Sequence, residues 1–286
     1  MKIFFMVKAF TFGLFLSFTF WNCEDQKDEP SIGPVPDTFS KKVLIEEFTG
    51  AWCGYCPDGA LILENIINQN VGFVIGVSAH SGDAMEVSQT SFLESTYSNP
   101  GYPSGMVDRF NFNDNVSINR GIWDYLASEQ LQKEALCGLA IQSKVQANTA
   151  KINVHTGFKM AMNGEHRLTV YLIENGVKGS GYGYDQANYY DTDSTSLFYG
   201  LGNPIESFEH NHTLRLILSE PLGDLIDPSF LVPKGEFIKY YEIDISSYNS
   251  DNLFLVAFIT FIGENYLSHE VLNAQKCEIN GTKDWD

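Results

Sequence analysis

VLIEEFTGAWCGYCPDGA, residues 43–60, joins an apolar run to two cysteines, Cys53 and Cys56. The run before the cysteines is rich in β-branched and apolar residues, which is typical of a strand. From Cys56 onward apolar residues recur at helical spacing as far as Ile67, which predicts an amphipathic helix of about four turns. A cysteine pair between a strand and a helix can be a redox pair, half of a metal site or a structural staple.

Strand and helix patterns alternate on both sides of this stretch. VGFVIGVSA (71–79) is a nearly continuous apolar run, as expected for a strand buried on both faces. A short helix is predicted from Gln89 to Tyr97, and GYPSGMVDRF (101–110) indicates a turn that enters a strand. Apolar residues between Ile118 and Ala135 mark a longer helix. We therefore expect residues 41–136 to form an α/β layered domain.

After Cys137 the apolar pattern changes to a period of two. Strand-like segments separated by turn residues are LAIQSKVQA (139–147), AKINVHT (150–156), HRLTVYLIE (166–174), HTLRLILS (212–219), FIKYYEIDI (237–245) and LFLVAFITF (253–261). Several short strands without strong helices are typical of a β-sandwich. The predicted fold class is thus an α/β domain followed by an all-β sandwich domain over residues 137–286.

One connection in the second half, from about Asn175 to Glu209, is long and rich in tyrosine. Loops longer than about 15 residues in a compact domain are often functional or mobile. An aromatic loop of this kind could form a platform for a sugar or a peptide. A loop that packs its own tyrosines onto the sandwich is the simpler expectation.

The N-terminal segment has a short basic start and an apolar run from Ala9 to Trp21, which predicts a signal peptide over residues 1–22. A transmembrane anchor is the alternative. Cys23 follows at the position of a lipid-modified cysteine, with a soluble secreted product as the alternative. EDQKDEP (24–30) resembles the signal that sends Bacteroidetes lipoproteins to the outer face of the outer membrane, although charge runs are usually solvated linkers. Residues 23–40 are expected to be a lipidated N-terminus and flexible tether.

Charge and ligand counts exclude two classes of function. The formal net charge is −18, and so acidic a surface repels phosphate backbones, which makes nucleic acid a poor partner. A structural zinc site needs four ligands, and only one Cys-x-x-Cys pair is present. His210 and His212 fall in the other predicted domain. No metal site and no cofactor are therefore expected.

A redox function of the pair depends on its place at the start of a helix. The thiolate of Cys53 would be stabilised by the unpaired N–H groups and the dipole of that helix. Cys56, one turn later on the apolar face, would be the sheltered resolving thiol, and Trp52 would form an aromatic wall beside the nucleophile. His80, at the end of the strand over 71–79, could tune Cys53 or shuttle a proton; a plain turn histidine is the alternative.

The cysteine stretch resembles the active-site region of thioredoxin-fold proteins. This resemblance implies that the domain over residues 41–136 is thioredoxin-like and that Trp52 to Cys56 form the redox motif. It implies that Glu47, where thioredoxins have aspartate, is the buried acid that moves the proton of the resolving thiol. The Gly-Tyr pair between the cysteines resembles that of periplasmic disulfide isomerases, and the direction of electron flow stays open.

The same resemblance extends to the loop that would face the disulfide. It places Pro103, in GYPSG, at the cis-proline position, with the backbone of Tyr102 beside an extended substrate segment. Trp52, Tyr55 and Tyr102 are therefore the expected substrate-binding residues.

Over roughly residues 40–280 the chain resembles the 28-kDa outer membrane protein family of Bacteroidetes lipoproteins. The motifs that carry this resemblance are EEFTGAWCGYCP, HNHTLR (210–215) and VLNAQK (271–276). The family is defined by location and fold more than by chemistry. It implies that the protein lies at the outer membrane of a Gram-negative cell envelope, is held there by a lipid anchor and faces the cell surface.

Two further cysteines lie at the first and last predicted strands of the second domain. In an oxidising compartment Cys137 and Cys277 are expected to form a structural disulfide. Two separate buried thiols are almost as well supported, because each cysteine lies in an apolar segment.

These patterns support two functions of different classes. The leading hypothesis is a cell-envelope thiol–disulfide oxidoreductase that acts on protein or peptide disulfides with an unknown redox partner. The alternative is a surface-exposed binding lipoprotein in which the Cys53–Cys56 pair is static.

Overall fold

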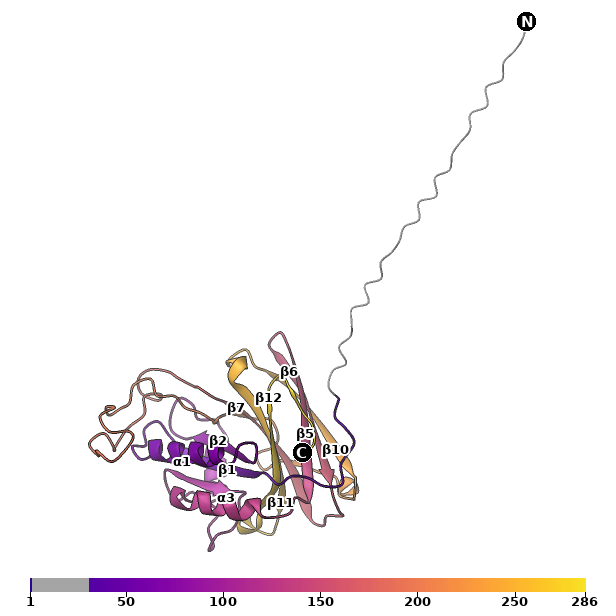
Figure 1. Cartoon of the computed structure of the whole chain (residues 1–286), viewed down its shortest axis with the longest axis horizontal. Coiled ribbons are helices and arrows are strands. Elements are labelled where there is room, and N and C mark those ends of the chain that lie inside the picture. Colours follow the sequence, from indigo (N-terminus) through magenta and orange to yellow (C-terminus); the bar gives the residue numbers. More distant parts are fainter. Residues whose placement is uncertain (2–30) are drawn as a thin grey trace. The chain divides into compact units, whose positions relative to one another are not determined.

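The apolar run that opens the cysteine stretch forms β1 (Val43–Thr49), a strand buried along its whole length. The computed structural model describes Met1 and residues 31–286, and β1 lies within its larger sheet (Figure 1). β1 pairs in parallel with β2 (Val74–His80) and antiparallel with β3 (Ser104–Val107), which pairs with β4 (Ile118–Asn119). Burial on both faces explains why most of β1 is apolar. It also makes the two glutamates of this strand exceptional.

Three helices cover this part of the sheet. α1 (Cys56–Gln69) and α3 (Trp123–Leu131) share one apolar cluster with β1, β2 and β3. α2 (Thr90–Thr96) contributes Leu93 to the cluster on the other face. The helix predicted between Ile118 and Ala135 is shorter than expected, because Ile118 belongs to β4 and a 3₁₀ turn precedes Trp123.

The second half is built from strands, as predicted. β5 (Cys137–Gln146), β6 (Thr149–Phe158), β10 (Glu236–Asp244) and β13 (Thr282–Lys283) form a four-stranded antiparallel sheet in the order β10-β6-β5-β13. The remaining strands join the larger sheet: β7 (Glu165–Glu174), β8 (Thr213–Ile217), β9 (Asp224–Leu225), β11 (Leu253–Ile262) and β12 (Glu270–Glu278). The order of that mixed sheet is β12-β11-β7-β8-β2-β1-β3-β4, with β9 beside β7.

The core between the two sheets follows the period of two in the strands. Leu168, Val170 and Leu172 of β7 belong to the cluster shared with β5 and β6. Tyr171 and Ile173, the intervening residues, belong to the cluster that contains α2. β7 is therefore buried on both faces, as successive side chains point to opposite sides of a strand. The protein is β-rich with few helices, consistent with a β-sandwich.

The boundary expected at residue 136 does not separate two sheets. β8 pairs in parallel with β2 through Ser78 and Thr213, so the larger sheet contains strands from both predicted domains. Residues 31–286 form one compact unit. The physical reason is that β2 would otherwise be an edge strand with unpaired backbone groups, and β8 covers that edge.

A last strand was predicted at Cys277, but its extent back to Glu270 was not, because the buried face of β12 carries polar side chains. Asn273 donates to the carbonyl oxygen of Cys137 at 2.8 Å, and Gln275 donates to that of Leu139 at 3.3 Å. These contacts satisfy backbone groups between the sheets. They also make the strand look polar in sequence.

The expected disulfide between Cys137 and Cys277 is wrong, since both cysteines are free and buried. Asn273 lies opposite Cys137, whereas the Sγ atom of Cys277 lies 4.0 Å from the carbonyl oxygen of Ile141. The two cysteines are thus offset by four residues along packed strands, or roughly 13 Å. A disulfide needs Cα atoms closer than about 7 Å, so this packing keeps the thiols apart.

Residues 31–40, expected as part of a tether, instead lie against the folded protein. The carbonyl oxygen of Gly33 accepts a hydrogen bond from the indole of Trp285, and that of Val35 accepts one from Lys234. The side chains of Val35 and Phe39 pack on glycines of β6 and β5 that leave no room for a Cβ atom. Cys23 and the expected signal peptide after Met1 lie outside the described residues. Within the described part of the chain, no helix is long and apolar enough to cross a membrane.

Candidate active site

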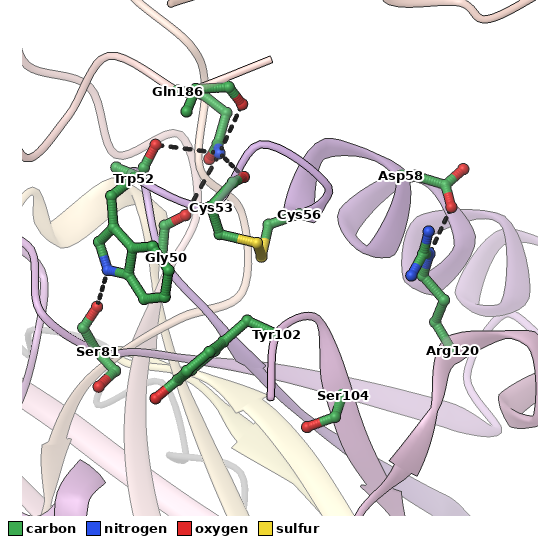
Figure 2. The surroundings of a disulfide bond; sticks show 12 residues. Gly50, Trp52, Cys53, Cys56, Asp58, Ser81, Tyr102, Ser104, Arg120 and Gln186 are labelled. Atoms are coloured by element: carbon green, nitrogen blue, oxygen red, sulfur yellow. Dashed lines mark hydrogen bonds and ion pairs between the residues drawn. A yellow bond between two sulfur atoms is a disulfide. The ribbon is translucent and has the colours of Figure 1, made fainter. Parts of the chain in front are cut away.

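Cys53 and Cys56 form a disulfide where β1 passes into α1 (Figure 2). Their Cα atoms are 5.3 Å apart, and Cys56 is the first residue of the helix, followed by Pro57. The turn is closed by two backbone hydrogen bonds, from Cys53 to Gly50 and from Cys56 to Cys53. Both cysteines are buried, with Cys53 5% and Cys56 1% exposed. Cys53 is therefore the more accessible of two sheltered sulfur-bearing residues.

Two aromatic residues lie on one side of the disulfide. The indole of Trp52 donates to the carbonyl oxygen of Ser81 at 2.7 Å and meets the ring of Tyr102 edge-on, with centroids 5.0 Å apart. Trp52 is 42% exposed, so it presents an aromatic face to solvent beside the cysteines. The Tyr102–Pro103 peptide bond is cis. The hydroxyl of Tyr102 donates to Glu94, and burial raises the pKa of Tyr102 to about 12.

Glu47 lies fully buried beneath the start of α1. Its Oε2 accepts a hydrogen bond from the hydroxyl of Ser78 at 3.0 Å, whereas Oε1 has no partner among the described residues. A Cβ atom on Gly59 would lie 2.5 Å from Oε1 and 2.8 Å from Pro103, so glycine is required where these groups converge. Burial raises the pKa of Glu47 to about 8, against the opposing effects of Ser78 and Arg120.

His80 ends β2 and connects the cysteine turn to the second half of the chain. Its Nδ1 lies 2.6 Å from the carboxylate of Asp83, which also accepts a hydrogen bond from the backbone of Ala51 at 2.7 Å. The ring of His210 meets that of His80 edge-on at 5.0 Å. Burial, together with the charge of His80, lowers the pKa of His210 to about 4. His210 is therefore neutral at physiological pH.

The long tyrosine-rich connection lies across the cysteine turn. We call residues 175–212 the cover loop; it runs between β7 and β8 toward the N-terminal end of α1 (Figure 1). The side-chain amide of Gln186 donates to the carbonyl oxygens of Gly50, Ala51 and Cys53 at 3.3, 3.2 and 2.9 Å. Figure 2 shows Gln186 on one side of the disulfide and Tyr102 on the other. The simpler expectation, that this loop packs its tyrosines onto the sandwich, is wrong.

Backbone and aromatic contacts extend this attachment. The N–H groups of Ala187 and Tyr189 donate to the carbonyl oxygens of Ala51 and Gly54, at 2.7 and 2.9 Å. A Cβ atom on Gly54 would lie 2.3 Å from the ring of Tyr189, so the loop and the turn are in close contact.

Tyr55, the residue between Gly54 and Cys56, packs against two tyrosines of the cover loop. It is 52% exposed and meets the rings of Tyr189 and Tyr190 edge-on, with centroids 5.2 and 5.8 Å away. Arg120 adds a link by bonding both Asp58 on α1 and the hydroxyl of Tyr190.

A cavity of about 200 Å³ separates α1 from the cover loop. One wall comes from β1, α1 and β2 and includes Glu47, Cys56, Glu64, Ser78 and His80. The other comes from the cover loop and includes Gln186, Phe198, His210 and His212. The cavity is therefore lined by the more buried cysteine, the buried acid and three histidines.

The structure brings most of the expected site residues together. Grouped around the disulfide are Glu47, Trp52, Cys53, Tyr55, Cys56, His80, Tyr102 and Pro103, whereas Cys137 and Cys277 lie elsewhere. Gln186, Asp83, His210 and His212 were not predicted to lie here. The HNH motif was visible in sequence, but its assignment to a separate domain hid its position. Gln186 carried no signal beyond the unusual length of its loop.

The fold and the site define a β-rich protein built around a Cys-x-x-Cys disulfide at the start of a helix, above a buried acid. The family described as Outer membrane protein Omp28 matches residues 90–283, more than half of the chain, and the protein belongs to that family. The match begins after the cysteine stretch. The family name associates the protein with the outer membrane.

Solved structures with the same fold are distant in sequence. HBP35 of Porphyromonas gingivalis is 19% identical with a TM-score of 0.68, over 85% of this chain and 76% of that chain. Protein AGR_C_4864 from Agrobacterium tumefaciens is 14% identical with a TM-score of 0.51, over 85% of this chain and 97% of that one. No curated protein sequence matches. These likenesses concern the fold alone.

Within residues 31–286, no group of three or more histidine, cysteine, aspartate or glutamate side chains is arranged to hold a metal ion.

Proposed function

We propose that the protein is a cell-envelope thiol–disulfide oxidoreductase whose Cys53–Cys56 pair lies in a thioredoxin-like setting. The observation that carries the proposal is the carboxyl of Glu47, fully buried and lining the same cavity as Cys56. Burying a carboxyl with one oxygen unpartnered costs stability, and a static disulfide does not require it. A carboxyl with a pKa of about 8 is suited to exchange a proton with a thiol near neutral pH.

In the reduced protein, the thiolate of Cys53 attacks a client disulfide, and one client sulfur leaves as a thiolate. Cys56 then gives its proton to Glu47 and attacks the Sγ of Cys53. The bond between Cys53 and the client breaks, the second client thiolate leaves, and the Cys53–Cys56 disulfide forms. Two electrons pass from the pair to the client. In reverse, the oxidised pair takes two electrons from a client dithiol.

The substrate class is a cysteine-containing segment of a protein or peptide. Trp52 and Tyr55 are half exposed beside the disulfide, and Tyr102 meets Trp52 on the Pro103 side. We assign these aromatic residues to client binding, because large rigid rings bury much area at little entropic cost. A second dithiol or disulfide protein would reset the pair after each turnover.

The second candidate is a surface binding protein with a static disulfide. One observation favours it: the cover loop bonds directly to the cysteine turn, and both cysteines are at most 5% exposed. In this function the pair fixes the turn on which the loop rests. The two candidates differ in whether Cys53 reacts once the disulfide is reduced.

Trapping of clients distinguishes them. Cys56→Ser should accumulate mixed disulfides through Cys53, because no second thiol resolves them. These species should appear on non-reducing gels of envelope extracts and disappear in the Cys53→Ser/Cys56→Ser double variant. If the Cys56→Ser protein stays monomeric and unmodified, the static alternative holds.

Alkylation of the reduced protein provides an independent readout. Cys53 should react quickly near neutral pH, because the helix N-terminus lowers a thiol pKa below its free value. Burial raises the pKa of Cys137 to about 12 and that of Cys277 to about 11, so neither should interfere. Equal, slow reaction of Cys53 and Cys56 would contradict the enzymatic function.

We also propose that the protein is held to the outer membrane by a lipid on Cys23 and faces the cell surface. The family match and the sequence of residues 1–30 support this location. Mass spectrometry of the mature protein should find Cys23 as the lipid-modified first residue. Replacing Lys27, Asp28 and Glu29 by alanine should leave the protein membrane-bound but protected from added protease.

A further inference from the structure

Two buried atoms without hydrogen-bond partners belong to residues that line one cavity. Within residues 31–286, neither Oε1 of Glu47 nor Nδ1 of His212 has a partner, and both residues line the cavity beneath the cover loop. Glu47 is 0% and His212 is 7% exposed. Buried polar atoms of this kind are normally satisfied by ordered water. A cavity of about 200 Å³ has room for several molecules.

The contacts of His212 indicate which of its nitrogens can accept a proton. Nε2 lies 3.0 Å from the Oε2 atom of Glu64, a carboxylate that is 43% exposed. A carboxylate accepts hydrogen bonds, so Nε2 carries the proton and Nδ1 has a free lone pair. The hydrogen bond from His212 lowers the pKa of Glu64, which keeps it ionised. Glu64 can therefore stabilise a positive charge on His212 and reach solvent.

The other polar groups around the cavity are already engaged. His80 is bound to Asp83, and His210 lies 2.8 Å from the carbonyl oxygen of Tyr184 and stays neutral. At the rim, Glu209 pairs with Lys178. Ser78 and the charge of Arg120 act on Glu47, and the charge of Lys276 acts on Glu64. Among these groups, His212 alone combines a free nitrogen with a direct link to an exposed carboxylate.

We propose that this cavity is the proton path of Glu47 and that His212, oriented by Glu64, passes the proton between the cavity and solvent. The inference rests on the proposed function, in which Glu47 takes a proton from Cys56 in each cycle. The O–H bond on Glu47 then breaks, and the proton moves through cavity water to Nδ1 of His212. The Nε2 proton leaves through Glu64 to solvent, and Glu47 returns to a carboxylate. No electrons move in this step.

The test follows the proton on Glu47 directly and needs no client. In the oxidised full chain, a pH jump across about pH 8 should change the infrared band of the protonated carboxyl, assigned by its loss in Glu47→Gln. His212→Gly should slow the return to equilibrium by at least about tenfold, and added imidazole should restore it. Glycine suits this position, because His212 has a φ of +56°.

Two further variants guard against a merely structural effect. His212→Asn also tolerates a positive φ and should be as slow as His212→Gly, whether or not imidazole helps it. Glu209→Gln, at the rim but bonded to Lys178, should keep the wild-type rate. Wild-type rates in both His212 variants, or slowing that imidazole does not relieve in His212→Gly, would overturn the proposal. Failure of the proposed function would instead appear as an absence of trapped clients.

Discussion

At the scale of single residues, Glu47 has the most perturbed environment in the site. Burial raises its pKa to about 8, although Ser78 and Arg120 act in the opposite direction. At neutral pH the carboxyl is therefore mostly protonated, and only its ionised fraction can accept the proton that the proposed function assigns to it. It ionises close to the pH at which thiols do. A group whose charge changes in this range can take part in proton transfer without a large free-energy cost. Gly59 permits this arrangement by leaving room for Oε1 beside Pro103.

The raised pKa has a consequence for stability. The unfolded chain loses this proton near pH 4.5, whereas the folded protein keeps it until about pH 8. The folded state binds the extra proton between those values. The contribution of Glu47 to the free energy of unfolding is therefore largest at low pH, falls as pH rises from about 4.5 to about 8, and is constant beyond.

Glu47→Gln should remove this fall. The quantity to compare is the free energy of unfolding of the variant minus that of wild type. This difference should be higher at about pH 9 than at about pH 4, by roughly 2–5 kcal/mol. Urea unfolding over a series of pH values measures the difference. Glu129→Gln, an exposed carboxyl on α3, serves as the control and should keep the wild-type pH profile. Parallel profiles for wild type and Glu47→Gln would show that Glu47 is not protonated in the folded state.

At the scale of elements, the cover loop and the cysteine turn behave as one structural unit. Gln186 donates to three carbonyl oxygens of the turn, and Tyr189 occupies the space that a side chain on Gly54 would fill. The loop thus restrains the turn that carries Cys53. Under the proposed function, a client would reach the disulfide beside this loop, on the side of Trp52 and Tyr102.

Gly54→Ala should separate the two elements, because the new Cβ atom would lie 2.3 Å from the ring of Tyr189. We expect a loss of about 1–3 kcal/mol in the free energy of unfolding and faster reduction of the disulfide by a small dithiol. Tyr189→Ala provides the matched background, since it removes the obstructing ring. If Gly54→Ala costs as much there as in wild type, the loop does not restrain the turn.

The sequence predicted the elements whose apolar pattern is dictated by local burial. The predicted runs with a clear period match β1, α1, β2, β5, β6, β7, β8, β10 and β11, because each presents a regular face to the core. β12 was predicted only as a last strand at Cys277, without bounds, since Asn273 and Gln275 satisfy backbone groups inside the core and interrupt its apolar pattern.

The part of the site that was predicted from sequence is also the part that depends on local structure. Cys53, Cys56 and Glu47 lie in one continuous stretch, and their proximity follows from a strand entering a helix. Gln186, His210 and His212 reach the site only because β8 pairs with β2. Long-range strand pairing of this kind depends on the whole fold and leaves no local pattern.

At the scale of the whole molecule, a buried ionic network joins strands from both halves of the chain. Arg109, after β3, forms two hydrogen bonds with Glu46 of β1, both at 2.8–2.9 Å. Tyr171 of β7 donates to the same carboxylate at 3.1 Å and accepts from Arg109 at 3.1 Å. The guanidinium also lies over the ring of Phe258 of β11, 5.0 Å from its centroid. Together with the continuous sheet, this network makes the halves interdependent.

Arg109→Met should lower the free energy of unfolding by about 3–5 kcal/mol, because it leaves Glu46 buried without its partner. Unfolding should still occur in one transition, since the larger sheet spans both halves. Denaturant curves followed by tryptophan fluorescence and by far-UV circular dichroism measure both quantities. The Glu46→Gln/Arg109→Met double variant should recover part of the loss. Two separated transitions in wild type would show instead that the halves fold independently.

The reduction potential of the Cys53–Cys56 pair tests the proposed function most directly, because it compares the oxidised and reduced states of the whole folded protein. The measurement is equilibration of the pure protein with glutathione buffers, with the Cys53→Ser/Cys56→Ser variant as the blank. A catalytic pair should have a potential between about −120 and −270 mV. A potential below about −300 mV, the range of structural disulfides, would contradict the enzymatic function and leave the pair as a staple for the cover loop.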